Sequence, residues 1–280
     1  MCMGFGCNAA GVTGCRIIDS PRERLIAILT NSFVPCNGRF PTILAVLTMF
    51  FAVGTGFFTS LSLAVLLAAV ILLGIFMTFF SSWLLSKTVL KGVPSSFTLE
   101  LPPYRRPQFL RVLVRSVLDR TIHVLWRALI AAAPAGLIIW VLANIKAGDT
   151  TLLLHLAGFL DPAGKLMGLD GIILLAFILG LPANEIVVPI MIMAYTAQGT
   201  LSDAGSLTGL HALLVQNGWT CFTAVSMLLF TLMHWPCATT LLTVKKETHS
   251  LKWTFLAFLL PTAMGFLFCF LFNCAVRLFF

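Results

Sequence analysis

Glu185 is the residue of this chain whose surroundings most strongly suggest chemistry. It lies in the stretch LGLPANEIVVPIM (179–191), between Pro182 and Pro189, and apolar residues flank that stretch on both sides. A charged side chain at the centre of a membrane helix costs about 2.5–3.5 kcal/mol on insertion scales, so it normally faces a cavity, a cation or a proton. The alternative is a buried carboxyl group that accepts hydrogen bonds from backbone amides freed at the helix break.

Three cysteines and one histidine are the other side chains with the chemistry to bind a metal ion. Cys36 and Cys237 each follow a proline, Cys7 precedes an asparagine, and His234 lies three residues before Cys237. Thiolate and imidazole groups suit borderline transition metals better than Mg²⁺ or Ca²⁺. Packing is the alternative for each, because a free cysteine in apolar surroundings behaves as a small hydrophobe. If the helix is continuous from His234 to Cys237, the two side chains share one face.

Two asparagines complete the set of candidate ligands. Asn8 and Asn184 each stand in a short motif near a helix breaker, and their side-chain carbonyls are plausible oxygen ligands. Asparagine at the start of a helix is more often a cap, so that role stays open for both. No nucleophile and base occur together in a pattern typical of an enzyme.

The composition is that of an integral membrane protein. Of the 280 residues, 59% are hydrophobic and only 10% are charged, whereas a soluble domain carries about 25% charged residues. The formal charge is +8, but the basic residues cluster between apolar runs, which indicates cytoplasmic loops and argues against nucleic-acid binding. The first residues contain no secretory signal.

A membrane-spanning helix needs about 20 apolar residues, and five runs satisfy that requirement. They are Phe40–Phe58, Leu61–Ser86, Val124–Ile145, Trp219–Val244 and Trp253–Val276. The stretch Gly171–Ala197 is also long enough, but prolines interrupt it. Interrupted backbone at membrane depth is tolerated only where protein or a water-filled cavity satisfies its polar groups.

The loop charges predict which side each segment faces. The basic segment 87–122, whose second half reads as an amphipathic helix around Arg115, is placed in the cytoplasm. The segment 16–39 carries four arginines and is placed on the same side, whereas loop 146–170 faces outward. The arginines of 16–39 are Arg16, Arg22, Arg24 and Arg39.

The basic loop 245–252 can face the cytoplasm only if 171–197 enters the membrane and turns back. Because the positive-inside rule places this basic loop in the cytoplasm, the charges predict that 171–197 is a re-entrant hairpin.

The two halves of the chain contain similar short motifs. GFGCNAAGV (4–12) resembles GLPANEIVV (180–188), with Gly4 matching Gly180 and Asn8 matching Asn184. VPCNGRFPT (34–42) and WPCATTLLT (235–243) share a Pro-Cys pair. The predicted orientations are opposite, as in the inverted repeats of transporters. Because the first motif begins three residues after Met1, we expect the chain to be part of a longer protein or to work beside another polypeptide.

Five motifs together resemble the membrane portion of ferrous iron transport protein B (FeoB). They are GFGCN, CNGRFP, ELPPYRRP, GLPANEI and HWPCATTLLTVKKET, in the family's order and over nearly the whole chain. The resemblance implies an all-α polytopic helical bundle with two pseudo-symmetric, inverted gate repeats that contain broken or re-entrant helices. It implies a first gate region at 1–86, a cytoplasmic connecting segment at 87–122 and a second gate region at 123–280. It also implies Fe²⁺ as substrate and Cys36 and Cys237, with Cys7 less securely, as ligands.

The chain departs from the family in one respect. The family's GTPase domain carries a phosphate loop of the form GxxxxGK[ST], and no such motif occurs here. We therefore expect no bound cofactor, and GTP to act only through an absent domain or a companion polypeptide. The resemblance further implies a small cytoplasmic accessory protein, and a homo-oligomer is possible.

The sequence thus predicts the membrane permease core of a bacterial ferrous iron uptake transporter, located in the inner cell membrane with several membrane passes. A transporter of another substrate, such as a nucleoside, on the same repeat is one alternative. A non-transporting membrane scaffold or truncated remnant is the other.

Overall fold

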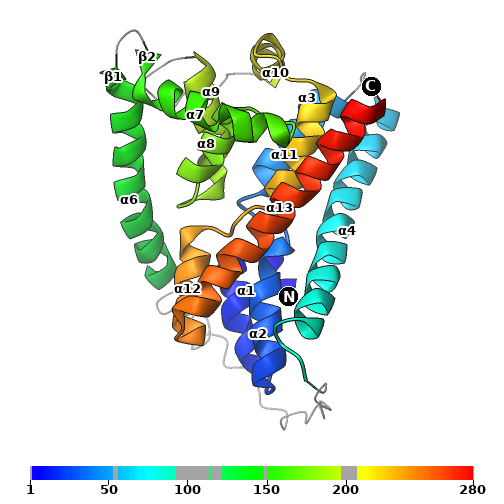
Figure 1. Ribbon diagram of the computed structural model, residues 1–280, viewed down its shortest axis with the longest axis vertical. Helices are drawn as coiled ribbons and strands as arrows, with labels where there is room; N and C mark the ends of the chain where they lie inside the picture. The colour runs from blue at the N-terminus through cyan, green and yellow to red at the C-terminus, as the bar shows by residue number, and fades with distance from the viewer. Residues whose placement is uncertain are drawn as a thin grey trace.

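The computed structural model is an elongated bundle of helices, several of them short and interrupted (Figure 1). It describes residues 2–52, 56–92, 114, 122–147, 150–196 and 207–279. The amphipathic helix expected around Arg115 therefore lies outside the described residues, apart from residue 114. The elements are η1 (Cys2–Phe5), α1 (Asn8–Gly14), η2 (Cys15–Ile17), α2 (Pro21–Thr30), η3 (Asn31–Phe33), α3 (Phe40–Phe51), α4 (Phe57–Lys87), α6 (His123–Asn144), β1 (Lys146–Ala147), β2 (Thr150–Thr151), α7 (Leu152–Leu166), α8 (Gly171–Leu179), η5 (Asn184–Ile186), α9 (Val187–Thr196), α10 (Leu207–Gln216), α11 (Cys221–Met233), α12 (Ala238–Thr248) and α13 (Leu251–Phe279).

Long apolar helices confirm the prediction of a multi-pass, all-α membrane protein. Within the described residues, 58–87, 221–248 and 251–279 are long and apolar enough to cross a membrane. The helix α4 presents most of its apolar side chains to the outside, as expected where the surrounding solvent is lipid. The only β structure among the described residues is the antiparallel pair formed by β1 and β2.

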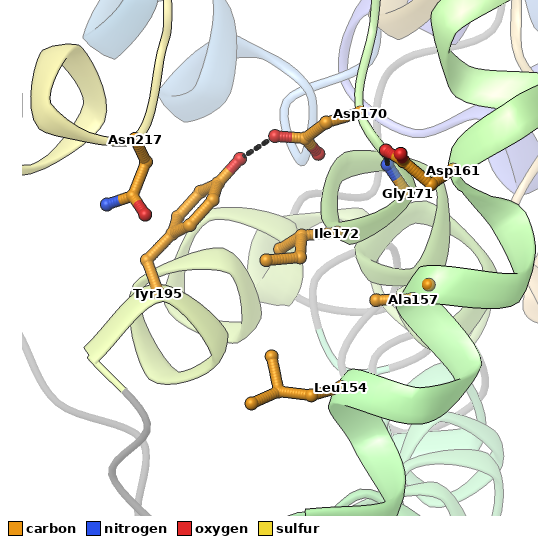
Figure 2. A pocket seen from close by; sticks show the side chains of 9 residues that line it. Leu154, Ala157, Asp161, Asp170, Gly171, Ile172, Tyr195 and Asn217 are labelled. Carbon is orange, nitrogen blue, oxygen red and sulfur yellow. Dashed lines mark hydrogen bonds between the residues drawn. The ribbon is translucent and has the colours of Figure 1, made fainter. Parts of the chain in front are cut away.

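The predicted hairpin at 171–197 is present as two antiparallel arms, α8 and α9. Asp170 caps the start of α8 by accepting a hydrogen bond from the Ile173 backbone amide at 2.7 Å. Tyr195, in the last turn of α9, donates a hydrogen bond to the Asp170 carboxylate, so the two arms meet at their open end (Figure 2). Trp219 Nε1 donates to the same tyrosine oxygen at 2.8 Å. The segment therefore turns back on itself.

Helix α7 packs against α8 and adds a third arm that was expected to be loop. The expectation that 146–170 is a loop is wrong, because Leu152–Leu166 forms a 15-residue helix; its outward-facing position stays a prediction. The axes of α7 and α8 are bent by 110° at the connection. A Cβ atom at Gly171 would lie 1.9 Å from the Ala157 carbonyl oxygen, so only glycine permits this close approach.

One other expected span is shorter than predicted, and a second contains a break although residues 221–248 together remain long enough to cross a membrane. The run Phe40–Phe58 contains α3, which has 12 residues and ends at Phe51. The run Trp219–Val244 is divided into α11 and α12 by an extended segment at His234–Cys237. Pro236 cannot donate a backbone hydrogen bond, and His234 has an extended backbone with ψ of 172°. His234 and Cys237 therefore do not share a helical face.

One end of the molecule gathers the basic segments. The Arg16 guanidinium donates to Glu247 on α12 at 2.6 and 2.7 Å, and Arg22 on α2 donates to the Leu90 carbonyl just beyond α4. The start of α13 lies at the same end (Figure 1). We call it the basic end; α7, α10 and the open end of the hairpin lie at the opposite end.

The hydrogen bonds of Tyr195 predict a measurable loss of stability when its hydroxyl is removed. Tyr195→Phe leaves Asp170 and Trp219 without this partner, and hydrogen bonds to charged groups contribute about 1.5–3 kcal/mol. We expect the thermal unfolding midpoint of the detergent-purified chain to fall by several degrees. Thr196→Val is the matched control, since its hydroxyl donates within its own helix and its loss should cost under about 0.5 kcal/mol. Equal shifts for the two variants would contradict this assignment.

The gathering of basic segments at one end also predicts the membrane orientation. Single cysteines introduced at Lys246 and at Asp161, in a chain whose native cysteines are replaced, should react with an impermeant maleimide from opposite sides of the membrane. By the positive-inside rule, Lys246 should be labelled from the cytoplasm and Asp161 from outside. Labelling of both positions from the same side would show that the α8–α9 segment spans the membrane.

Candidate functional site

Four interruptions of helical structure meet near the middle of the molecule, and we call them the four breaks. The first, 6–7, separates η1 from α1; the second, 34–39, separates η3 from α3. The third, 180–183, is the tip of the α8–α9 hairpin, and the fourth, 234–237, separates α11 from α12. Proline occurs in the last three and removes a backbone donor in each. Every predicted ligand lies in a break or within two residues of one.

Backbone hydrogen bonds connect the breaks in the same way in the two halves of the chain. The amide of Asn37, which follows Cys36, donates to Gly6 O at 3.4 Å. The amide of Ala238, which follows Cys237, donates to Leu181 O at 2.8 Å. In each half, the residue after the Pro-Cys pair therefore binds the backbone of that half's other broken motif. This correspondence supports the internal repeat that the sequence motifs suggested.

Glu185 stands at the tip of the hairpin with its carboxylate free. Its side chain is exposed, and no hydrogen bond or ion pair to it occurs within the described part of the chain. Gly38, in the second break, lies next to the Glu185 side chain. A Cβ atom added to Gly38 would lie 3.3 Å from Glu185 Oε1. The alternative of a buried carboxyl group satisfied by backbone amides therefore does not describe this structure.

His234 is buried, and both of its ring nitrogens face polar atoms. Its Nδ1 lies 2.9 Å from Thr231 O and 3.2 Å from Phe230 O, so a proton on Nδ1 would be donated to these carbonyls. Its Nε2 lies 3.4 Å from Asn184 Oδ1; with the proton on Nδ1, Nε2 has a lone pair, and this contact is a hydrogen bond only if the Asn184 amide turns its nitrogen toward the ring. A histidine that donates its other ring N–H to a backbone carbonyl has the orientation found among metal-binding histidines.

The three predicted cysteines lie on three different breaks. Cys36 is buried, whereas Cys7 and Cys237 are half-buried and form the N-caps of α1 and α12. Cys7 and Cys36 are both close enough to Cys237 to interact with it electrostatically. All three are free thiols, and Cys237 Sγ contacts Thr240 Oγ1 at 3.2 Å.

Asn8 has a structural role in this conformation. With its amide nitrogen facing them, it donates to Gly4 O and Val34 O, each at 3.2 Å. Its own backbone carbonyl accepts a hydrogen bond from Asn31 Nδ2 at 2.9 Å. The asparagine therefore fastens the first break to the second, and a further role as an oxygen ligand stays a prediction.

The candidate ligands converge on one region without forming a coordination sphere. Among the residues that the structure describes, no three histidine, cysteine, aspartate or glutamate side chains are placed to hold one metal ion. Binding of an ion by several of them therefore requires the breaks to move relative to one another.

Arg39 corrects the sequence reading most directly. It was grouped with the cytoplasmic arginines, but its side chain is completely buried. It lies at the end of the second break and donates hydrogen bonds to backbone carbonyls of both halves. The available signal was its position directly after CNG and before the apolar run that begins at Phe40.

A small cavity of about 260 Å³ lies at the open end of the hairpin, away from the breaks. Asp161 and Asp170 line it together with Tyr195 and Asn217 (Figure 2). Asp161 is already engaged, since it accepts a hydrogen bond from the Gly171 amide and pairs with Lys165 at 2.5 Å. The sequence analysis did not identify this group of residues.

Two family descriptions match the chain. Residues 67–119 match the family described as "Ferrous iron transport protein B C terminus", and residues 125–251 match the family "Gate", described as "Nucleoside recognition".

Relatives named "Fe(2+) transporter FeoB" match over nearly the whole chain. The Staphylococcus aureus (strain MSSA476) protein is 29% identical over 97% of this chain and 39% of its own length. The Synechocystis protein is 26% identical over 96% of this chain and 42% of its own length. The Methanocaldococcus jannaschii protein is 24% identical over 92% and 38%, respectively. The chain thus spans about two fifths of each relative's length, and no solved structure is significantly similar to it.

The close approach of Gly38 to Glu185 predicts that this glycine limits the position of the carboxylate. Gly38→Leu places a branched side chain where Glu185 now lies, and a displacement of about 1 Å near a reacting centre can reduce a rate a hundredfold. In the transport role proposed below, metal uptake into vesicles should fall by about tenfold or more. Gly136→Leu on α6 is the control, because a Cβ atom there meets no other atom within 4 Å. Equal uptake by the two variants would show that the contact has no functional role.

Proposed function

We propose that this chain, which is similar to the gate and C-terminal regions of ferrous iron transport protein B, forms the membrane permease core of a ferrous iron transporter. Fe²⁺ is the proposed cargo, and the four breaks form its path. The chain is a multi-pass membrane protein, and we place it in the inner cell membrane of a bacterium.

The free carboxylate of Glu185 is the observation that carries this proposal. An exposed carboxylate without a partner, at the tip of a hairpin among apolar helices, is suited to meet a cation. The helices α1, α3 and α12 begin at the breaks, and their N-termini carry partial positive charge. A divalent ion there therefore needs an anionic ligand, and Glu185 supplies one.

Sulfur and nitrogen donors account for a preference for Fe²⁺ over harder ions. One carboxylate cannot replace the hydration shell of Fe²⁺, so we propose that Cys36 and Cys237 contribute thiolates as the breaks close on the ion. Coordination deprotonates a thiol, which supplies the negative charge only when metal is present. His234 offers its Nε2 lone pair if Asn184 moves aside, and Cys7 and Asn8 are the remaining candidates.

The partners follow from the same premise. We propose that opening is controlled by a GTPase domain or companion polypeptide, with a small cytoplasmic accessory protein, since this sequence contains no phosphate loop. The basic end is the face on which such a cytoplasmic partner would dock.

Nucleoside transport is the second candidate, because the family matched by residues 125–251 is described as "Nucleoside recognition". A nucleoside site needs aromatic surface open to a base. In the part of the chain described, three aromatic rings around the fourth break, Phe177, Phe230 and Trp235, pack against one another or against His234. This arrangement favours the ion as cargo.

Uptake of radioactive iron into proteoliposomes tests the proposal, with the chain alone and with a GTPase partner. Glu185→Gln, and separately Cys36→Ser and Cys237→Ser, should each lower Fe²⁺ uptake by at least about tenfold at normal protein level. The cysteine variants should also shift competition in favour of Mn²⁺, because a hydroxyl is a harder ligand than a thiolate.

Cys269→Ser is the matched control, since Cys269 is a buried thiol that donates to Ser226 O on the neighbouring helix α11. It should leave iron uptake and the Mn²⁺ competition unchanged. Wild-type uptake by all three site variants would mean that Glu185 and the cysteines do not contact the ion. Uptake of labelled uridine without uptake of iron would support the nucleoside candidate.

A further inference from the structure

Arg39 joins the two Pro-Cys elements by hydrogen bonds to four backbone carbonyls. Nη1 donates to Ser32 O at 2.7 Å and to Leu232 O at 2.9 Å. Nη2 donates to His234 O at 3.0 Å and to Trp235 O at 3.3 Å. The acceptors include residues nearly 200 positions away in the sequence, so the guanidinium connects the two halves of the chain.

The accepting carbonyls lie where helices end. Leu232 belongs to the last turn of α11, and the next two acceptors follow that helix directly. Carbonyls at a helix C-terminus have no partner within the helix and carry partial negative charge. The planar guanidinium, with several donors in a fixed fork, can satisfy carbonyls from both halves at once. A lysine ammonium has three N–H donors on a single nitrogen, and they cannot reach the same four oxygen atoms.

Stability alone does not account for this side chain. Arg39 is completely buried and stays charged, and it has no carboxylate partner among the described residues. Its Nε is buried without a hydrogen-bond acceptor. A buried charge without a counter-ion lowers the stability of the folded protein, and an apolar residue of similar volume often gives a more stable protein.

The position of Arg39 relates it directly to the proposed ligands. Its backbone amide donates to Cys36 O at 2.9 Å, so the arginine is in the same turn as Cys36. Two of its acceptors immediately precede Pro236 and Cys237. Cys36 and Cys237 both lie near enough for their thiolate forms to be stabilised by its charge.

We propose that Arg39 is a positioning residue, a clamp between the two Pro-Cys elements that sets the spacing of Cys36 and Cys237 and thereby the affinity and selectivity of the site for Fe²⁺. The inference rests on the proposed function for its effect on iron, and on the geometry alone for its effect on the two cysteines. Arg39 itself does not bind the ion.

The positional effect is measured without metal, on wild-type chain, Arg39→Lys and Arg39→Gln in membrane vesicles. In both variants the rate of alkylation of Cys36 and Cys237 by N-ethylmaleimide, followed by mass spectrometry, should rise by about fivefold or more, because the elements separate locally. Cys269 in the same molecules should react at the wild-type rate. Arg24→Lys is the matched control, since Arg24 also donates to a backbone carbonyl, Ile18 O at 2.9 Å, outside the breaks.

The effect on iron separates positioning from a purely structural role. For Arg39→Lys the KM for Fe²⁺ should rise by about tenfold while the maximal rate per folded molecule changes by less than about threefold, and competition by Mn²⁺ should increase. Unchanged alkylation of Cys36 and Cys237, or a wild-type KM and Mn²⁺ competition, would overturn the proposal. So would failure of both variants to accumulate as folded protein, because Arg39 would then act through stability. If the wild-type chain takes up no iron and alkylation still changes as expected, the proposed function is wrong and the clamp stands.

Discussion

Satisfaction of backbone hydrogen bonds in an apolar environment is the constraint on which this structure depends. A membrane helix satisfies its own amides and carbonyls, but each break exposes several of them where no lipid group can bind them. Here the breaks bind one another: Asn37 to Gly6, Ala238 to Leu181, and Arg39 to the carbonyls after α11. A single break would be unstable at this depth, whereas four that meet supply one another's partners.

The same constraint explains why polar side chains collect at the centre of so apolar a molecule. Asn8 and Asn31 fasten the first two breaks by side-chain bonds to backbone groups, and Asn184 meets His234 between the third and fourth. Each of these side chains is buried. Side chains that bind the backbone at helix ends also lie beside the space between those ends. The polar side chains that hold the breaks together and the candidate ligands therefore occur in the same region.

The sequence predicted the parts of this arrangement that depend on local chemistry. The prolines and Glu185 within an apolar run identified the hairpin, and the Pro-Cys pairs were recognised as repeated motifs and candidate ligands, although not as breaks. It could not predict what depends on neighbours far away in the chain. Hydropathy over a window reads α11 and α12 as one span, because the fourth break is itself apolar. Charge counting places Arg39 in the cytoplasm, because nothing local shows that carbonyls almost 200 residues away receive its guanidinium.

Charge is distributed unequally over the two sides of the second break. Gly38 faces the free carboxylate of Glu185. The guanidinium of the next residue, Arg39, is buried in the protein and donates hydrogen bonds to backbone carbonyls. Among the described residues the two groups form no ion pair with each other. A negative group thus remains available on the open side, and a positive group fixes the backbone on the closed side. The second break therefore has a carboxylate from the hairpin beside Gly38 and a guanidinium fixed among the carbonyls on its other side.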